Sequence, residues 1–402
     1  MNCLAQGQGT RDHRRNSYTY FEDRLAGMNR RNLLIGGGSA LALGGAGAFA
    51  WRRSTGSMAA YDAYSQALRA PPGISADVRD LIRYATLAAN GHNTQPWRFA
   101  VADRTIRLFP DGRRRTPFVD PDDHHLFVSL GCAAENLGIA ARATGRAGEI
   151  QIEPGDGCAL AFSFGAHEAV ADPLFDAIRL RQSTRSLYDG RAVPPADLAA
   201  LERAAAEPGV RLILITDRAR IARLRDLIVA GSDAQMADAA FMAELKHWIR
   251  FNPRRAIRSG DGLFSAASGN PSLPTVLGER VFAAFVTAKE ESDKYARQIA
   301  SSPVLAIFVG DEADKTHWMR VGRSCQRFML AATARGLKHA FLNQPVEVAA
   351  LRPALAALIG EPGKRPDLVL RLGYGPALPY SPRRPVQSVL MTEHYRAEAG
   401  MI

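Results

Sequence analysis

The chain has 402 residues, of which 47% are hydrophobic and 23% charged, so its composition is that of a folded globular protein and excludes a disordered or fibrous one. Its 51 lysine and arginine residues outnumber the 40 acidic residues and give a formal net charge of +11. This charge would suit nucleic acid, a membrane surface or an anionic cofactor, but the arginines are scattered without forming a basic helix, so we expect no nucleic-acid partner.

The N-terminal segment has the pattern of an export signal. Arg30 and Arg31 precede a glycine-rich, weakly apolar run over residues 33–50, which ends in a small-residue cleavage site. Such a run after paired arginines is typical of the twin-arginine route, so we predict a signal over residues 28–51 and an exported, periplasmic protein. An uncleaved signal that anchors the chain in the membrane stays open. A dinucleotide-binding loop is disfavoured, because arginines stand on both sides where that motif needs a strand and an acid.

The other segments are assigned by composition and hydrophobic pattern. Residues 1–27 are polar and unpatterned, and we interpret them as a disordered extension or as a start assigned ahead of Met28. Residues 52–75 are rich in Arg, Ser, Ala and Pro and are predicted to be a linker. The rest is predicted to be α+β, in two halves over residues 76–170 and 171–402.

Secondary structure is predicted within each half from the spacing of apolar residues. We expect helices at 78–89, 174–181 and 195–206, and strands at 97–102, 105–109, 211–216, 304–309 and 368–372. Residues 251–278, rich in Gly, Ser, Pro and Asn, are expected to form a long loop that acts as a lid or a binding loop.

An internal repeat links the two halves. Residues 131–145 align without a gap on residues 322–336, and both stretches are alanine-rich, begin with a glycine and end with a glycine. This pattern predicts two related helices that pack closely through their small residues. A chance match between alanine-rich helices is the alternative.

Three motifs carry a family resemblance. The first runs from Ala88 to Trp97 and contains Asn93-Thr-Gln-Pro-Trp, the second is Arg181-Gln-Ser183-Thr-Arg185, and the third is the basic C-terminal stretch with Arg383 and Arg384. Together they resemble the FMN-dependent nitroreductase family. In that family the arginine–serine motif precedes the Asn-x-Gln-Pro-Trp motif, whereas here it follows. The order resembles the Acg-like branch, whose members are single-chain pseudo-dimers with one FMN, and it implies two tandem nitroreductase-like halves.

The resemblance implies which residues hold the FMN phosphate. Arg181 and Arg185 would bind it through planar, bidentate donors, Ser183 would add a hydroxyl, and Arg383 and Arg384 would add charge from the other side. Taken singly, each arginine could instead be a solvated surface residue.

The flavin ring would be held by other segments. The amide of Asn93 would pair with the polar edge of the ring, and Asn90 and Gly91 would approach it by backbone, although the family has different residues at those two positions. The resemblance also places the backbone amides of Leu342, Asn343 and Gln344 beside flavin N5.

No residue is assigned as catalytic and no metal is expected. His92 could be an acid on the substrate side, but a solvent-facing loop histidine is favoured. The run from Asp120 to His125 could suggest a metal site, but its acids and histidines are adjacent in a turn-like stretch, so a solvated turn is favoured.

The resulting hypothesis is an exported FMN oxidoreductase that passes electrons from reduced flavin to a nitroaromatic, a quinone or a similar planar acceptor. The electron donor stays open between NAD(P)H and a membrane quinol or partner protein, because nicotinamide cofactors are intracellular. The alternative function is an FMN storage or sequestering protein with little turnover.

Overall fold

The computed structural model describes residues 50–71, 77–153 and 159–391. The predicted N-terminal extension and nearly all of the predicted export signal lie outside these residues. The described residues from Ser54 onward belong to one compact unit. Among the described residues, no helix combines the length and the apolar character that crossing a bilayer requires.

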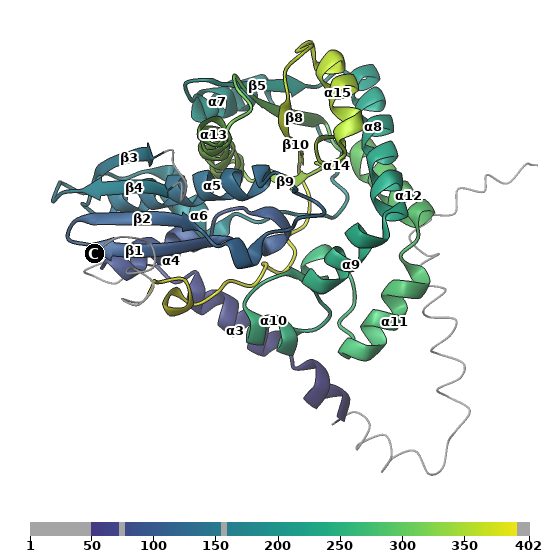
Figure 1. The fold of residues 1–402 in the computed structure, drawn as a ribbon, viewed down its shortest axis with the longest axis horizontal. Coiled ribbons are helices and arrows are strands. Elements are labelled where there is room, and N and C mark those ends of the chain that lie inside the picture. Colours follow the sequence, from purple (N-terminus) through teal and green to yellow (C-terminus); the bar gives the residue numbers. More distant parts are fainter. Residues whose placement is uncertain (1–49, 72–76, 154–158, 392–402) are drawn as a thin grey trace, which may run out of the picture. The chain divides into compact units, whose positions relative to one another are not determined.

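Two four-stranded antiparallel sheets organise this unit (Figure 1). The first has the order β1 (Trp97–Ala102), β2 (Thr105–Pro110), β4 (Ala159–Phe164), β3 (Gly148–Glu153). The second has the order β5 (Val210–Ile215), β8 (Val304–Gly310), β10 (Pro366–Gly373), β9 (Lys338–Phe341). The short strands β6 (Ile249–Arg250) and β7 (Leu263–Phe264) pair in parallel. The predicted α+β class with two halves is confirmed.

Helices surround the sheets, and several begin at an acidic cap. Asp77 and Asp80 form a capping box at the start of one helix, and the side chains of Asp217 and Asp314 cap two others. The helices are α3 (Met58–Leu68), α4 (Val78–Thr86), α5 (His124–Ala143), α6 (Pro173–Leu180), α7 (Pro195–Ala205), α8 (Arg218–Ala237), α9 (Ala239–Trp248), α10 (Pro253–Ser259), α11 (Thr275–Phe285), α12 (Ala288–Ala300), α13 (Lys315–Ala334), α14 (Gln344–Glu347) and α15 (Arg352–Ile359).

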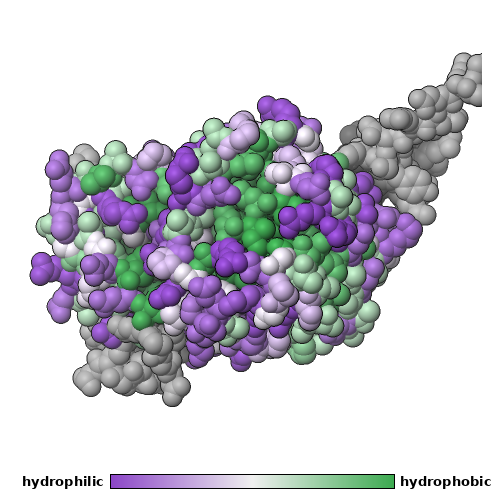
Figure 2. Space-filling model, turned by 90° about the horizontal axis from the view of Figure 1, so that it is seen from above, coloured by the Kyte–Doolittle hydropathy of each residue, from purple (hydrophilic) through white to green (hydrophobic). Residues whose placement is uncertain are grey.

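The second sheet is buried on both faces. In β8 and β10, Phe308 and Leu370 point into the hydrophobic cluster that contains α5 and α13, while Ile307 and Val369 point into a cluster that contains α8 and α15. Every position of these two strands is therefore buried, although the sheet is antiparallel. In the first sheet, β2 alternates buried and exposed residues around Arg107, as a strand with one covered face does. On the face shown in Figure 2, hydrophobic residues gather near the middle, among hydrophilic ones.

Helices α5 and α13 lie side by side and touch at a pair of glycines. A Cβ on Gly131 would stand 2.0 Å from the carbonyl oxygen of Met319, and one on Gly322 would stand 2.0 Å from that of Val128. The contact is reciprocal, because each glycine meets the carbonyl three residues before the other glycine. This geometry explains why both copies of the predicted repeat begin with glycine, and it supports a repeat rather than a chance match.

Two segments differ from their predicted form. Part of the predicted linker at 52–75 is helix α3, and the predicted loop at 251–278 contains α10, β7 and the start of α11. Helix α3 buries Tyr61, whose ring centre lies 4.4 Å from that of Phe264. The two segments pack against each other through apolar side chains. They are far apart in the sequence, so this contact could not be predicted from local composition.

The five predicted strands are confirmed to within two residues at each end, and the three predicted helices are confirmed with end shifts of up to three residues. Strands β3, β4 and β9 were not predicted. β9 has only four residues, whereas β3 and β4 have six each and pair with each other over their whole length.

The glycine contact gives the first prediction. Gly322→Ala should lower the free energy of unfolding by about 2–3 kcal/mol, because the new methyl group must push two helix backbones apart. Chemical denaturation would measure the change. Gly112→Ala is the matched control, because a Cβ at Gly112 would meet no atom within 4 Å. Equal stabilities of the two variants would contradict the close helix contact.

Candidate functional site

Two arginines from distant parts of the chain meet at one backbone carbonyl. Nη2 of Arg181 donates to the carbonyl oxygen of Leu87 over 3.1 Å. Nη2 of Arg383 donates to the same oxygen over 3.3 Å and to that of Ala88 over 3.1 Å. The predicted arginine motif and the predicted basic C-terminus are therefore brought together beside the end of α4.

A third arginine, Arg69, joins this pair. Its Nη1 donates to the hydroxyl of Ser65 over 3.0 Å, and its guanidinium lies 4.0 Å from the ring centre of Tyr380. Arg69, Arg181 and Arg383 are 8%, 4% and 3% exposed. We call these three residues the arginine cluster.

The arginine cluster has no balancing carboxylate. Within the described part of the chain, none of its members forms an ion pair, and the Nε atom of each is buried without a hydrogen-bond partner. Burial lowers the pKa of Arg69 and of Arg181 to about 10. The pKa of Arg383 is lowered further, first by burial and then by the charges of Arg69 and Arg181. Burying like charges together is unfavourable, so the cluster is suited to an anion that carries more than one charge.

The three arginines come from two helix C-termini and from the C-terminal segment of the chain. Arg69 and Arg181 are the C-cap residues of α3 and α6, where cations are favoured by the negative end of the helix. Arg383 comes from the C-terminal segment, which returns to the first half and hydrogen-bonds there: the N–H of Phe99 donates to the carbonyl oxygen of Val389 over 2.8 Å.

The arginine–serine motif leads away from the cluster as an irregular segment with one isolated β-bridge. Ser183 forms a β-bridge with His339, and the N–H of Thr184 donates to the carbonyl oxygen of His339 over 2.8 Å. Because side chains alternate along an extended chain, Arg181, Ser183 and Arg185 share one face. The guanidinium of Arg185 is half-buried and makes no hydrogen bond within the described residues. The three predicted residues thus form a strip with an unpaired cation at its far end.

The Asn-x-Gln-Pro-Trp loop is held rigidly in a strained backbone conformation. His92, Asn93 and Gln95 have positive φ values of 46°, 54° and 54°. Asn90 steadies the turn, because its side-chain oxygen accepts a hydrogen bond from the N–H of Gln95 over 2.8 Å. Gly91, whose N–H donates to the hydroxyl of Ser129, begins the 3₁₀ turn Gly91–Asn93.

The amide of Asn93 is occupied by protein partners. Its nitrogen donates to the carbonyl oxygens of Gly262 and Pro382, and its oxygen accepts from Arg383 over 2.7 Å. The predicted pairing with a flavin ring would require these bonds to break. In this structure Asn93 positions Arg383. Gln95 likewise ties the loop to its neighbours, through the carbonyl of Gly260 and the N–H of Arg384.

The segment 342–344 borders the same region. The N–H of Leu342 is used by the carbonyl of Val369, whereas the N–H groups of Asn343 and Gln344 donate no hydrogen bond among the described residues. Gln344 also keeps a buried side-chain oxygen without a partner, and both ring nitrogens of His339 are buried without partners. Of the predicted ring contacts in this segment, the amides of Asn343 and Gln344 are thus free to donate and that of Leu342 is not.

Arg384 does not join Arg383. Successive residues of an extended chain point to opposite sides, and Nη1 of Arg384 lies 3.7 Å from a carboxylate oxygen of Asp111 instead. Arg384 therefore lies apart from the arginine cluster.

The Asp120–His125 run is not the solvated turn that we predicted. His124 and His125 are buried at the start of α5 and pair with carboxylates of the second half: Nε2 of His124 lies 2.8 Å from Asp367, and Nε2 of His125 lies 3.4 Å from Glu347. Asp367 and Glu347 are more than 200 residues away along the chain, so the pairing could not be predicted from the sequence. Within residues 50–71, 77–153 and 159–391, no group of three or more His, Cys, Asp or Glu is arranged to hold a metal ion.

The His125–Glu347 pair lies close to the far end of the strip. Burial lowers the pKa of His92, the charge of Arg185 adds to this effect, and that of Glu347 opposes it. His92 is partly buried in the structure, whereas a solvent-facing loop histidine was favoured. Tyr295 of α12 is also near, since Arg185 and Glu347 both act on its pKa. Sequence reasoning missed Arg69, Tyr295 and Glu347, which stand in no motif.

Comparison with known proteins finds relatives that match about four fifths of this chain. No family model matches the chain. "Putative NAD(P)H nitroreductase Rv3131" of Mycobacterium tuberculosis is 29% identical over 326 residues, which are 78% of this chain and 90% of that protein. "Putative NAD(P)H nitroreductase acg" of the same organism is 27% identical over 340 residues, 80% of this chain and 96% of that protein. These relatives confirm the resemblance that the motifs predicted, including the resemblance to Acg.

Two solved structures each resemble about half of this chain. A nitroreductase from Bacteroides fragilis with bound FMN is 18% identical, covers 51% of this chain and 90% of its own, and has a TM-score of 0.33. The FMN-dependent nitroreductase NfnB from Mycobacterium smegmatis, in complex with NADPH, is 14% identical, covers 56% of this chain and 96% of its own, and has a TM-score of 0.34.

The His125–Glu347 pair predicts a pH-dependent stability. Burial opposes the charge of both groups, yet their hydrogen bond raises the pKa of His125 and lowers that of Glu347. The contribution of Glu347 is present above its ordinary pKa of 4.5 and is lost as pH falls through its lowered value. The contribution of His125 is present below its ordinary pKa of 6.5 and is lost as pH rises through its raised value. The pair therefore stabilises the fold most between pH 4.5 and pH 6.5, where both contributions are fully present.

Glu347→Gln should therefore cost about 1–2 kcal/mol more unfolding free energy at about pH 5.5 than at about pH 9. Urea denaturation at both pH values measures the difference. Glu202→Gln, at an exposed position of α7, is the control and should show no such difference. A loss for Glu347→Gln that is independent of pH would exclude a charged pair.

Proposed function

We propose that this chain, a relative of the mycobacterial NAD(P)H nitroreductases, is an FMN-binding oxidoreductase of nitroreductase type. The observation that carries the proposal is the arginine cluster: among the residues that the structure describes, its three buried guanidinium groups each have an unpartnered Nε and no carboxylate is paired with them. A phosphomonoester dianion supplies the missing charge and accepts planar, two-point hydrogen bonds from arginine.

The strip from Arg181 to Arg185 suits the part of FMN that extends beyond its phosphate. Arg181 lies at the phosphate end, Ser183 offers a hydroxyl one step along, and Arg185 offers an unpaired cation at the far end. The free amides of Asn343 and Gln344 and the histidine at position 92 border this end. FMN, when bound, supplies reversible two-electron chemistry. The chain's own part is to hold the phosphate in the interior, to bind the polar edge of the ring and to exclude water.

The phosphate role of the arginine cluster is tested by comparing FMN with riboflavin, which lacks the phosphate. The unaltered protein should bind FMN more tightly. Arg181→Gln should weaken FMN by about 10- to 100-fold, because a charged hydrogen bond is lost, while leaving riboflavin binding nearly unchanged. Flavin fluorescence titration measures both affinities. Arg191→Gln, at an exposed position of the same segment, is the control. An FMN preference that survives Arg181→Gln would refute the phosphate assignment.

The donor and the acceptor are part of the proposal. The names of the relatives specify NAD(P)H, which makes a nicotinamide the first donor to examine; a membrane quinol or partner protein is the other candidate. We propose a nitroaromatic, a quinone or a similar planar compound as acceptor, since such a molecule can stack on a flavin.

Anaerobic spectroscopy of the FMN-loaded protein tests this turnover. NADPH or NADH should remove the visible flavin absorbance, and a quinone or nitroaromatic should restore it. Heat-denatured protein with the same free FMN is the control. Reduction by dithionite with no re-oxidation by any acceptor would instead support FMN storage with little turnover.

We also propose that the protein is exported by the twin-arginine route, with its signal either cleaved or kept as an N-terminal membrane anchor. Arg30 and Arg31 ahead of the glycine-rich run support this. Replacing both by lysine should retain the precursor in the cytoplasm, as cell fractionation and immunoblotting would show. Replacing Arg52 and Arg53, which follow the run, is the matched control. Unchanged export of the Arg30→Lys, Arg31→Lys variant would refute the signal.

A further inference from the structure

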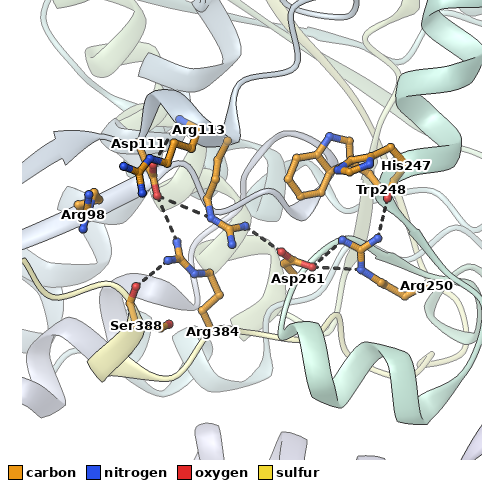
Figure 3. A pocket seen from close by; sticks show the side chains of 10 residues that line it. Arg98, Asp111, Arg113, His247, Trp248, Arg250, Asp261, Arg384 and Ser388 are labelled. Carbon is orange, nitrogen blue, oxygen red and sulfur yellow. Dashed lines mark hydrogen bonds and ion pairs between the residues drawn. The ribbon is translucent and has the colours of Figure 1, made fainter.

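Charged side chains line the pocket of about 470 Å³ shown in Figure 3, and several of them pair with one another. Asp261 lies 2.7 Å from Arg250 and 2.8 Å from Arg114. Asp111 lies 3.7 Å from Arg114 and 3.7 Å from Arg384, so these side chains form one row of charges. On β9, by contrast, a buried polar side chain has no partner in the part of the chain that the structure describes.

This side chain is the imidazole ring of His339. It is 0% exposed, and neither Nδ1 nor Nε2 has a hydrogen-bond partner among the described residues. Leaving a buried donor and a buried acceptor unpaired is unfavourable, and buried polar atoms nearly always have a partner. The ring is therefore suited to a ligand that both donates and accepts hydrogen bonds.

Strand pairing places His339 beside the arginine–serine motif. Ser183 forms its β-bridge with His339, and paired residues of neighbouring strands point to the same face. The imidazole ring and the hydroxyl of Ser183 therefore lie on one face. Leu372, which pairs with His339 from β10, belongs to the hydrophobic cluster that contains α5 and α13, so this face is turned toward those two helices.

The ring of His339 is held in its neutral form. Burial, and then the charges of Arg181 and Lys338, lower its pKa well below the ordinary value of 6.5. A neutral imidazole has one N–H donor and one acceptor nitrogen. It therefore complements hydroxyl groups, which donate and accept, better than it complements a phosphate dianion, which only accepts.

We propose that His339 recognises the polyol chain of the flavin, with its N–H and its acceptor nitrogen hydrogen-bonded to hydroxyl groups of that chain. The inference rests on the proposed FMN site. In that site Arg181 lies at the phosphate end of the strip and Arg185 at the ring end, and Ser183, the bridge partner of His339, stands between them in the chain. The polyol chain of FMN likewise lies between the phosphate and the ring.

The unpaired hydroxyl of Ser183 supports the same assignment. Within the described ranges it forms no hydrogen bond, and the residue is only partly buried, so its face of the strip is open to a ligand. A histidine and a serine on one face would offer the polyol chain donors and acceptors without any charge. The charged groups of the strip would then be left for the two ends of the flavin.

Riboflavin and lumiflavin separate the polyol chain from the rest of the ligand. Riboflavin has the ring and the chain but no phosphate, and lumiflavin has the ring alone, so the full-length protein should bind riboflavin more tightly. His339→Leu, which is similar in volume and has no polar side-chain atom, should weaken riboflavin and FMN by about tenfold and leave lumiflavin nearly unchanged. Flavin fluorescence titration measures these affinities.

Two further variants separate hydrogen bonding from a general effect of mutation. His339→Gln keeps a donor and an acceptor, so it should bind riboflavin nearly as tightly as the unaltered protein does. His167→Leu, at an exposed position, is the matched control and should change no flavin affinity. Far-ultraviolet circular dichroism confirms that each variant is folded.

Nuclear magnetic resonance of the histidine ring nitrogens tests the contact in the unaltered protein, and it decides the question if His339→Leu does not fold. Riboflavin should shift the resonances of one histidine, identified as His339 by their absence from His339→Gln, and lumiflavin should leave them in place.

The proposal is overturned if riboflavin binds no more tightly than lumiflavin, if His339→Leu binds riboflavin normally, if His339→Gln binds as weakly as His339→Leu, or if riboflavin leaves the His339 resonances in place. Any of these results, together with an FMN preference that depends on Arg181, would leave the proposed FMN site standing. Failure of the unaltered protein to bind any flavin would instead overturn the proposed function, and this inference with it.

Discussion

The constraint on which the rest of this structure depends is the burial of uncompensated positive charge. Arg69, Arg181 and Arg383 lie together in the interior, and the described residues offer them backbone carbonyls and an aromatic ring but no carboxylate partner. Placing three cations in a medium of low dielectric is costly unless an anion accompanies them. The surrounding fold is therefore suited to enclose an anionic group that balances the charge of the three arginines.

The site around the arginine cluster is built from both halves. The packing of α5 against α13 holds the halves together. Gly131 and Gly322 let the two backbones approach to a distance that any side chain would prevent. Across this junction, His124 and His125 of the first half meet acids of the second. The loop from the first half and the arginine strip from the second are brought together by this packing, and Arg181 and Arg383 meet at the carbonyl oxygen of Leu87.

Adjacent residues of the C-terminal segment serve two different cationic regions. Arg383 turns inward to the cluster, whereas Arg384 turns to the row of charges with Asp111. The Asn-x-Gln-Pro-Trp loop lies between them, and its Asn93 and Gln95 each hold one of the two arginines. His92, Asn93 and Gln95 all have positive φ, and this strain is maintained because both sides of the loop are tied.

The sequence by itself determined the α+β class, the repeat, most strands of the two sheets and the nitroreductase relationship, because these depend on local periodicity and on short contiguous motifs. It also identified Arg181 and Arg383, which stand in such motifs. Tertiary structure alone decided that Arg69 completes the cluster, that Arg384 faces elsewhere, that Asn93 holds an arginine, and that His124 and His125 are buried beside acids. Each of these depends on partners far apart in the chain, and neither periodicity nor spacing carries information about which distant side chain fills a given space.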